Sequence, residues 1–250
     1  MPDDDDSIGN ERSVQPAPSG DSALVSSPRA SWSPNAGFAP RRLALVFAAG
    51  IIAAAAVMPF DPLITRAVSS ITLGGDVKRE MEFLQQFGAI TSCLIIACVI
   101  WLLDPARRKD LPRAALACIA SAAVVFVLKS LVGRARPRLR EPWHFAFPWE
   151  QYTIARGDRP PVSVYAWEFW RGGVSDIWSL PSGHTASAFA LASVLSRLYP
   201  ALMPLVLPIA CLVGICRVVL GAHYPSDVII GGALGWCIAG LAPVHGRGKG

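Results

Sequence analysis

Three short clusters of basic residues, histidines and one aspartate lie at the ends of apolar stretches, and these side-chain types bind and transfer phosphate groups. In the first cluster, 129–137 (KSLVGRARP), Lys129 and Arg136 are seven residues apart. Two helical turns return position i+7 to the same face, so both cations would point at one ligand if the helix continues to Pro137. Taken alone, the pattern fits equally well a snorkelling lysine followed by a basic helix end.

The second cluster, 179–185 (SLPSGHT), lies where a long loop enters an apolar stretch. Proline and serine before such a stretch predict the start of a helix. A helix N-terminus offers unpaired N–H groups and a positive dipole end to an anion. Gly183 would let that anion approach the backbone closely, and His184 on the first turn would donate a proton to a leaving group. The alternative is a capping serine beside a histidine that has no chemical role.

The third cluster, 217–227 (RVVLGAHYPSD), places Arg217 and Asp227 at the ends of two adjoining apolar stretches, with His223 in the turn between them. A histidine held by a carboxylate beside an arginine is the arrangement of an activated nucleophile. The carboxylate fixes the ring tautomer and supports the imidazolium that forms. A structural role for Asp227 as a helix N-cap is compatible with this function.

The composition of the chain predicts a membrane protein. It is 52% hydrophobic and 16% charged, with a mean hydropathy of +0.41, which is too apolar for an ordinary soluble domain. The net charge of +5 does not indicate nucleic-acid binding, because the basic residues form no basic helix face or aromatic strand motif. The six cysteines lie inside apolar stretches, where we expect small buried side chains rather than disulfides or metal ligands.

Six apolar stretches approach the length that crosses a ~30 Å hydrocarbon core as a helix. They lie at about 43–60, 87–103, 114–133, 184–199, 202–221 and 227–243. We therefore expect an all-α bundle of six transmembrane helices over 41–244. A disordered tail over 1–40, which has few large apolar residues, and a short basic tail over 245–250 complete the chain.

The distribution of basic residues predicts the orientation of this bundle. Arginines and lysines before the first span, in the short loop after the second, at the end of the fourth and at the C-terminus share one side, which the positive-inside rule assigns to the cytoplasm. The long arginine-rich and tryptophan-rich loop 134–180 then lies outside, and all three clusters fall on that side. We expect a bacterial inner membrane protein whose site faces the periplasm. The segment 76–87 is expected as an interfacial helix, or as the lead-in to the second span.

Three cations, a helix N-terminus and two histidines on one face predict a phosphate site and phosphoryl transfer. Together the clusters resemble the signature of the type 2 phosphatidic acid phosphatase superfamily. Its Lys-x6-Arg-Pro, Pro-Ser-Gly-His and Arg-x5-His-x3-Asp parts match 129–137, 181–184 and 217–227 in order. One departure is Cys216, where the family often has a serine.

The resemblance implies a metal-independent and cofactor-independent phosphatase that acts on a lipid phosphate or pyrophosphate. His223 would attack phosphorus to form a phosphohistidine, Asp227 would orient its ring, and His184 would protonate the leaving group before water releases the phosphate. The remaining site residues would hold the phosphate oxygens: Lys129, Arg136, Ser182, Gly183 and Arg217. Substrate and membrane lipids are the implied partners, and no oligomeric state is indicated.

Two other functions share some of these features. Soluble haloperoxidases bind vanadate in the same type of site, but six apolar spans argue against that class. A transporter or a scaffold with a relic site is the second alternative, although transporters usually place polar residues at the midplane of broken helices. Arg134, Arg138 and Arg140 match no position of the signature, and we expect them in solvent rather than on headgroups. The tryptophans of the loop would line a tail entrance or anchor the loop in the interface.

Overall fold

The computed structural model describes residues 39–156 and 159–243, which all belong to one compact unit, 33–250. The expected tails over 1–40 and 245–250 lie outside the described residues, apart from Ala39 and Pro40 at the start of the first helix. The described part is mostly helical. Its α-helices are α1 (Pro40–Val57), α2 (Asp61–Ser69), α3 (Gly75–Leu84), α4 (Ile90–Leu103), α5 (Leu111–Leu131), α6 (Gly183–Leu198), α7 (Met203–Val219) and α8 (Pro225–Gly240).

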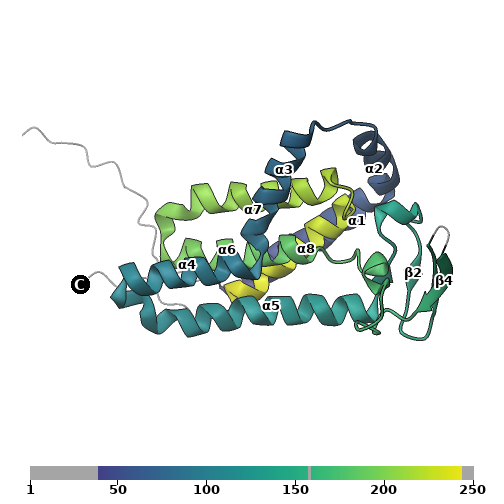
Figure 1. Ribbon diagram of the computed structural model, residues 1–250. Coiled ribbons are helices and arrows are strands. Elements are labelled where there is room, and N and C mark those ends of the chain that lie inside the picture. Colours follow the sequence, from purple (N-terminus) through teal and green to yellow (C-terminus); the bar gives the residue numbers. More distant parts are fainter. Residues whose placement is uncertain (1–38, 157–158, 244–250) are drawn as a thin grey trace, which may run out of the picture. The chain divides into compact units, whose positions relative to one another are not determined.

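Six of these helices coincide with the six apolar stretches and run back and forth along the bundle (Figure 1). Helix α8 packs against α1, α5 and α6, and α6 also packs against α5 and α7. Small residues allow this close packing: a Cβ on Gly235 of α8 would lie 2.0 Å from the carbonyl oxygen of Ala186 on α6. Glycine therefore brings the two helices that begin at the second and third clusters into backbone contact.

The outer surface of the bundle is apolar, as a lipid-facing surface must be. Leu45, Ile52, Leu94, Leu103 and Leu116 are among its exposed side chains. By length and hydropathy, Pro40–Ser69, Pro105–Leu131 and Pro200–Val219 can each cross a membrane. The bent pair Gly75–Gly88 and Ile90–Leu103 makes a fourth candidate, and Pro225–Gly240 is apolar but shorter. The described residues thus hold three or four candidate spans, and the count of six stays a prediction.

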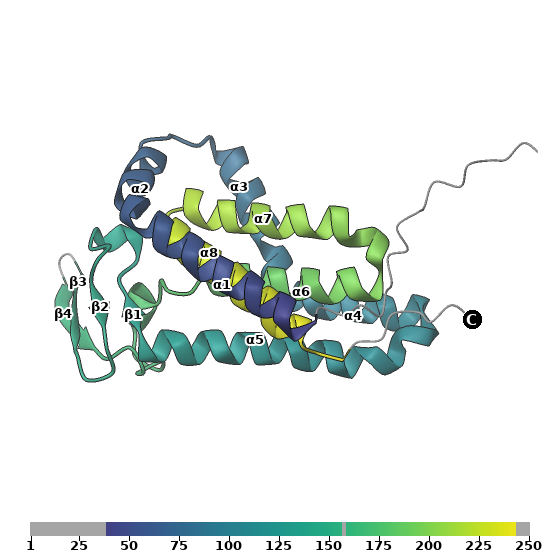
Figure 2. The same cartoon turned by 180° about the vertical axis from the view of Figure 1, so that it is seen from behind.

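The long loop differs from the all-α expectation because it carries short strands (Figures 1 and 2). Strand β1 (Gly133–Arg134) pairs with β2 (Phe145–Ala146), and β3 (Tyr152–Arg156) pairs with β4 (Arg159–Val164), both antiparallel. Buried Tyr152 and Ile154 alternate with the exposed Thr153. This alternation is too short to predict a strand from sequence. The loop has its own small core, which includes Ala135, Ile154, Val164, Ala166 and Ile177.

Three local expectations have different outcomes. Helix α5 ends at Leu131 and gives way to β1, so the helix does not continue to Pro137 and the i+7 argument for Lys129 and Arg136 is wrong. The segment 76–87 does form a helix, α3, followed by the 3-10 turn Gln85–Gly88 and a 60° bend before α4. Its position along a membrane surface stays a prediction. All six cysteines are free, but Cys98 and Cys211 are exposed rather than buried.

Candidate active site

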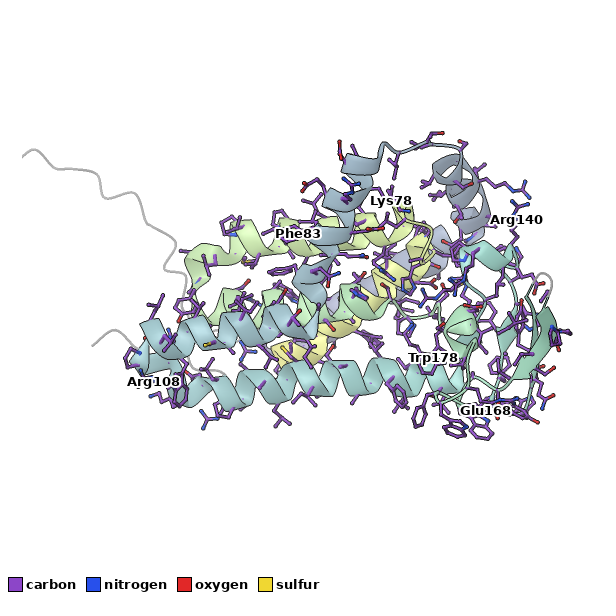
Figure 3. The ribbon with its side chains drawn as sticks, viewed as in Figure 1. Lys78, Phe83, Arg108, Arg140, Glu168 and Trp178 are labelled. Atoms are coloured by element: carbon purple, nitrogen blue, oxygen red, sulfur yellow. The ribbon has the colours of Figure 1, made fainter. Side chains whose placement is uncertain are left out.

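The three clusters meet at one end of the bundle, the end that carries the 134–180 loop and that is called the loop end below. Figure 3 shows Trp178 and Glu168 there and Arg108 at the opposite end. Lys129 and Arg217 lie in the last turns of α5 and α7. Ser182, Gly183 and His184 begin α6, and Asp227 lies in the first turn of α8. Arg136 follows β1 and His223 lies between α7 and α8. The structure therefore places every site residue expected from sequence at the loop end.

His223 is held in a single orientation by backbone groups. Its side chain is 2% exposed, and its Nδ1 lies 2.6 Å from the carbonyl oxygen of Ser179. A carbonyl only accepts hydrogen bonds, so Nδ1 carries the hydrogen and a neutral ring has its lone pair on Nε2. The turn that presents His223 includes Gly221, whose φ of 66° is left-handed, a conformation that glycine adopts without strain.

The electrostatic surroundings of His223 favour this neutral ring. Burial holds the pKa of His223 well below its usual value of 6.5, and the positive charges of Lys129, Arg136 and Arg217 lower it further. The hydrogen bond with Ser179 acts in the opposite direction but is the smallest of these causes. Both burial and the three positive charges therefore favour a His223 ring without a second proton.

Asp227 is linked to His223 through Ser179 rather than by a direct hydrogen bond. Its Oδ2 accepts hydrogen bonds from Ser179 Oγ (2.5 Å) and from the backbone N–H of Tyr224 (2.9 Å), and it lies 3.9 Å from His223 Nδ1. That last separation exceeds hydrogen-bond distance. Asp227 therefore acts on the ring of His223 through Ser179, whose hydroxyl it holds and whose carbonyl contacts Nδ1. Asp227 also closes a capping box with Tyr224, in which Tyr224 rather than Asp227 is the N-cap.

The expectation that Arg134 lies in solvent is wrong. Its side chain is fully buried, and its guanidinium donates to Asp227 Oδ1 at 2.6 Å and to Asp61 Oδ2 at 2.8 Å. Ser226 Oγ and the Pro142 carbonyl accept further hydrogen bonds from it. A buried arginine needs such partners, because an unpaired charge in the interior costs several kcal/mol. The two carboxylates supply the opposite charge.

Asp61 is a residue that sequence reasoning missed. It is fully buried at the start of α2 and accepts hydrogen bonds from the backbone N–H and the hydroxyl of Ser226, besides Arg134. One feature of the sequence could have identified it: Asp61 directly follows the first apolar stretch, and a carboxylate at that position needs a partner. The sequence alone did not indicate which of the many arginines that partner is.

Two of the three cations expected to hold phosphate have unused donors. The buried Nε atoms of Arg136 and Arg217 have no hydrogen-bond partner among the described residues. Arg217 donates from NH1 to Gln85 Oε1 at 2.5 Å, and the Arg136 backbone N–H donates to the Asp176 carbonyl at 2.8 Å. Burial, followed by the charges of Arg217 and Arg138, lowers the pKa of Arg136 to about 10, so it is still a cation at neutral pH. Buried unsatisfied donors of this kind fit an anionic ligand.

The N-terminus of α6 contributes backbone groups to the same place. Gly183 faces Lys129, since a Cβ on Gly183 would lie 3.9 Å from the Lys129 Cε. Lys129 is buried and donates to the Trp178 carbonyl. Ser182 is the N-cap residue, and its hydroxyl pairs with that of Thr185 at 2.9 Å instead of capping the helix. Its backbone N–H donates to the Asp227 carbonyl at 3.0 Å, which ties the starts of α6 and α8 together.

Across the described ranges, no three His, Cys, Asp or Glu side chains lie close enough together to bind a metal ion.

Comparison with known proteins decides the family. The family model described as the PAP2 superfamily matches residues 111–246, which is more than half of the chain and includes all three clusters. The chain belongs to the PAP2 superfamily. It is a phosphatase and an integral membrane protein.

Relatives of this PAP2 phosphatase include a decaprenylphosphoryl-5-phosphoribose phosphatase of Mycobacterium tuberculosis. It is 28% identical over 158 residues, 62% of this chain and 72% of that protein. A lipid A 1-phosphatase of Rhizobium johnstonii is 35% identical over 109 residues, 44% of this chain and 36% of that protein.

Among solved structures, a transmembrane PAP2 type phosphatidylglycerolphosphate phosphatase from Bacillus subtilis superposes with a TM-score of 0.56 at 26% identity. The match covers 82% of this chain and 94% of that one. The structure of Aquifex aeolicus LpxE shares the fold, with a TM-score of 0.50 at 18% identity. That match covers 72% of this chain and 92% of the LpxE chain.

Proposed function

We propose that this PAP2 phosphatase hydrolyses the phosphate monoester or pyrophosphate of a lipid through a phosphohistidine on His223, without a metal. The observation that carries the proposal is the 2.6 Å contact between His223 Nδ1 and the Ser179 carbonyl. It leaves Nε2 unprotonated beside Lys129, Arg136 and Arg217, whose charges act on the ring. A neutral imidazole nitrogen next to an anion site is suited to attack phosphorus.

The proposed reaction has two steps. In the first, Nε2 of His223 forms a bond to phosphorus while the bond from phosphorus to the lipid oxygen breaks, and His184 donates its proton to that oxygen. In the second, water attacks phosphorus, His184 accepts a proton from the water, and the bond between Nε2 and phosphorus breaks to release inorganic phosphate. Lys129, Arg136 and Arg217 stabilise the charge on the equatorial oxygens, with Ser182 and the Gly183 N–H as further donors.

Positioning residues keep this geometry in place. Asp227 holds the Ser179 hydroxyl, and the Ser179 carbonyl holds His223. Arg134 and Asp61 hold Asp227 from behind. The cations of the site supply the charge stabilisation that metal ions give to many other phosphoryl transfer enzymes, which is the reason to propose a metal-independent reaction.

The proposed substrate is a lipid that is reached from the outer, periplasmic side of a bacterial inner membrane. The relatives are named for phosphates on polyprenyl and lipid A carriers and on phosphatidylglycerol phosphate. The site lies at the ends of apolar helices, where a headgroup can reach it while the tails stay in the bilayer. The loop exposes Trp143, Trp149, Trp167 and Trp170, and tryptophans are typical of the membrane interface.

Phosphate release from the detergent-solubilised protein tests this function. The panel contains phosphatidic acid, phosphatidylglycerol phosphate, a polyprenyl pyrophosphate and lipid A, each assayed with and without EDTA. We expect release from at least one lipid, unchanged activity in EDTA, and inhibition by vanadate, which mimics the trigonal bipyramidal phosphorus. His223→Ala removes turnover, whereas His144→Ala on the loop is the matched control and keeps it. Activity that disappears in EDTA and returns with Mg²⁺ contradicts the metal-independent mechanism.

A further inference from the structure

A second cavity of about 740 Å³ lies at the loop end, between α2, the segment after β1 and the end of α7. Three arginines line it, Arg66 from α2 and Arg138 and Arg140 from the 3-10 turn Pro137–Leu139 and its C-cap. No acidic side chain is among the described residues of its wall. Figure 3 shows Arg140 at this end of the molecule. The cavity is therefore strongly basic.

The charges of these arginines are only partly neutralised. Arg138 is ion-paired with Asp176. In the described ranges no ion pair involves Arg66 or Arg140. The nearby carboxylate of Asp61 is already used by Arg134 and Ser226. Arg66 and Arg140 thus line the cavity as exposed residues without a carboxylate partner among the described residues, and an unpaired guanidinium suits a phosphate group.

Two buried hydroxyls belong to residues of the same wall. Thr65 Oγ1 and Tyr224 OH have no hydrogen-bond partner within the part of the chain that the structure describes. Tyr224 is 1% exposed. A buried hydroxyl without a partner is destabilising, so such groups in the wall of a cavity favour a ligand that accepts hydrogen bonds. A phosphate has acceptor oxygens for both hydroxyls as well as for the arginines.

The cavity adjoins the active site along three separate chain segments. Pro137, Val218 and Tyr224 line it and directly follow the site residues Arg136, Arg217 and His223. Neighbouring Cα atoms are about 3.8 Å apart. The cavity and the site therefore share three wall segments, and a substrate with one phosphate on His223 would carry its second phosphate past these segments into the cavity.

We propose that this cavity binds a second phosphate of the substrate, one that is not cleaved. The substrate class is then a lipid that carries a further phosphate, as a diester or a monoester, close to the phosphate that is hydrolysed. This inference rests on the proposed function, and among the lipids proposed there it favours those with a second phosphate. It also assigns a role to Arg138 and Arg140, which are exposed as the sequence predicts.

The test compares two diacylglycerol lipids in the same neutral detergent micelles: phosphatidylglycerol phosphate, with two phosphates, and phosphatidic acid, with one. The variant is Arg66→Gln/Arg140→Gln. The matched control is Lys78→Gln/Arg79→Gln on α3, which removes the same charge from residues outside the cavity wall. Charge-assisted hydrogen bonds lost from the cavity should reduce the preference for the two-phosphate lipid, as a ratio of KM values, at least ~10-fold. The control should keep the preference of the unmodified protein.

Binding by His223→Ala proteins separates this inference from the proposed function. Dissociation constants for the two lipids are measured in that background, with and without the cavity substitutions. A preference for the two-phosphate lipid that disappears only with the cavity substitutions supports the inference, whether or not the wild type turns over. A preference that is absent, or that survives them, overturns it. Equal weakening for both lipids would mean that the cavity contacts a part that the two lipids share rather than the second phosphate, and would also overturn it. Absence of phosphate release from every lipid contradicts the proposed function instead.

Discussion

Arg134 donates a 2.6 Å hydrogen bond to Asp227, and both side chains are fully buried at the loop end. The other oxygen of Asp227 accepts from the Ser179 hydroxyl, and the Ser179 carbonyl accepts from His223. A continuous set of contacts therefore runs from a residue outside the superfamily signature to the proposed nucleophile. Arg134 also pairs with Asp61, the first residue of α2, so α2 is connected to the site as well.

Arg134→Ala should destabilise the protein and reduce turnover. The change leaves Asp61 and Asp227 buried without their cation, and breaking a buried pair costs about 3–5 kcal/mol. Arg134→Lys keeps the charge but loses the fork that reaches both carboxylates, so kcat should fall more than KM rises. Thermal unfolding in detergent and steady-state kinetics measure the two effects. Arg171→Ala removes an exposed pair with Glu168 and should change stability by less than about 1 kcal/mol. An Arg134→Ala protein that unfolds like the wild type would contradict the positioning role.

The two histidines should respond differently to the leaving group. His184→Ala should slow a natural alkyl phosphate by about 10²–10⁴-fold, since general acid help matters most for a poor leaving group. With p-nitrophenyl phosphate, which leaves without a proton, His184→Ala should recover much of its lost rate. His223→Ala should recover none, because no phosphoenzyme forms. Equal losses on both substrates for both variants would show that the roles are wrongly assigned.

His223 should be neutral at pH 6.5, with its hydrogen on Nδ1. Burial and the three cations hold its pKa well below 6.5 in the folded protein, whereas the unfolded chain binds a proton near that pH. The unfolded state then binds more protons, so the free energy of unfolding should fall as the pH drops below about 6.5. Nitrogen chemical shifts of ¹⁵N-histidine-labelled protein, assigned with His223→Gln, report the tautomer. A doubly protonated His223 at pH 6.5 would exclude it as the resting nucleophile.

The orientation of the bundle can be tested with cysteines placed at its two ends. Lys109 and Arg171 are exposed, and their neighbours Arg108 and Glu168 lie at opposite ends of the bundle (Figure 3). In a background without the six native cysteines, Arg171→Cys should react with an impermeant reagent in sealed cells. Lys109→Cys should react only after lysis. Labelling of both positions in intact cells would contradict the six-span topology with an outer site.

Much of the helical framework and the gathering of the three clusters could be predicted from the sequence. Apolar length predicts where helices run. Pro225 is the first residue of α8, a position that the fixed φ of proline favours, and Pro181 directly precedes the N-cap residue of α6. With alternating helices, Lys129, His184, Arg217 and Asp227 then reach the same end without any knowledge of side-chain packing. These features depend on local chemistry and chain direction, which the sequence states directly.

Only the tertiary structure decided which polar groups pair. Arg134 finds Asp61 and Asp227, which are 73 and 93 residues away along the chain, and Ser179 rather than Asp227 contacts His223. No periodic pattern in the sequence predicts either pairing, because each depends on how α2, α6 and α8 pack around the loop. The sequence identified the charged residues of the three clusters, but it missed Asp61 and placed Arg134 in solvent. Burial, which makes an unpaired charge costly, requires the two carboxylates that enclose Arg134 behind the proposed nucleophile, whereas the exposed Arg140 needs no such partner.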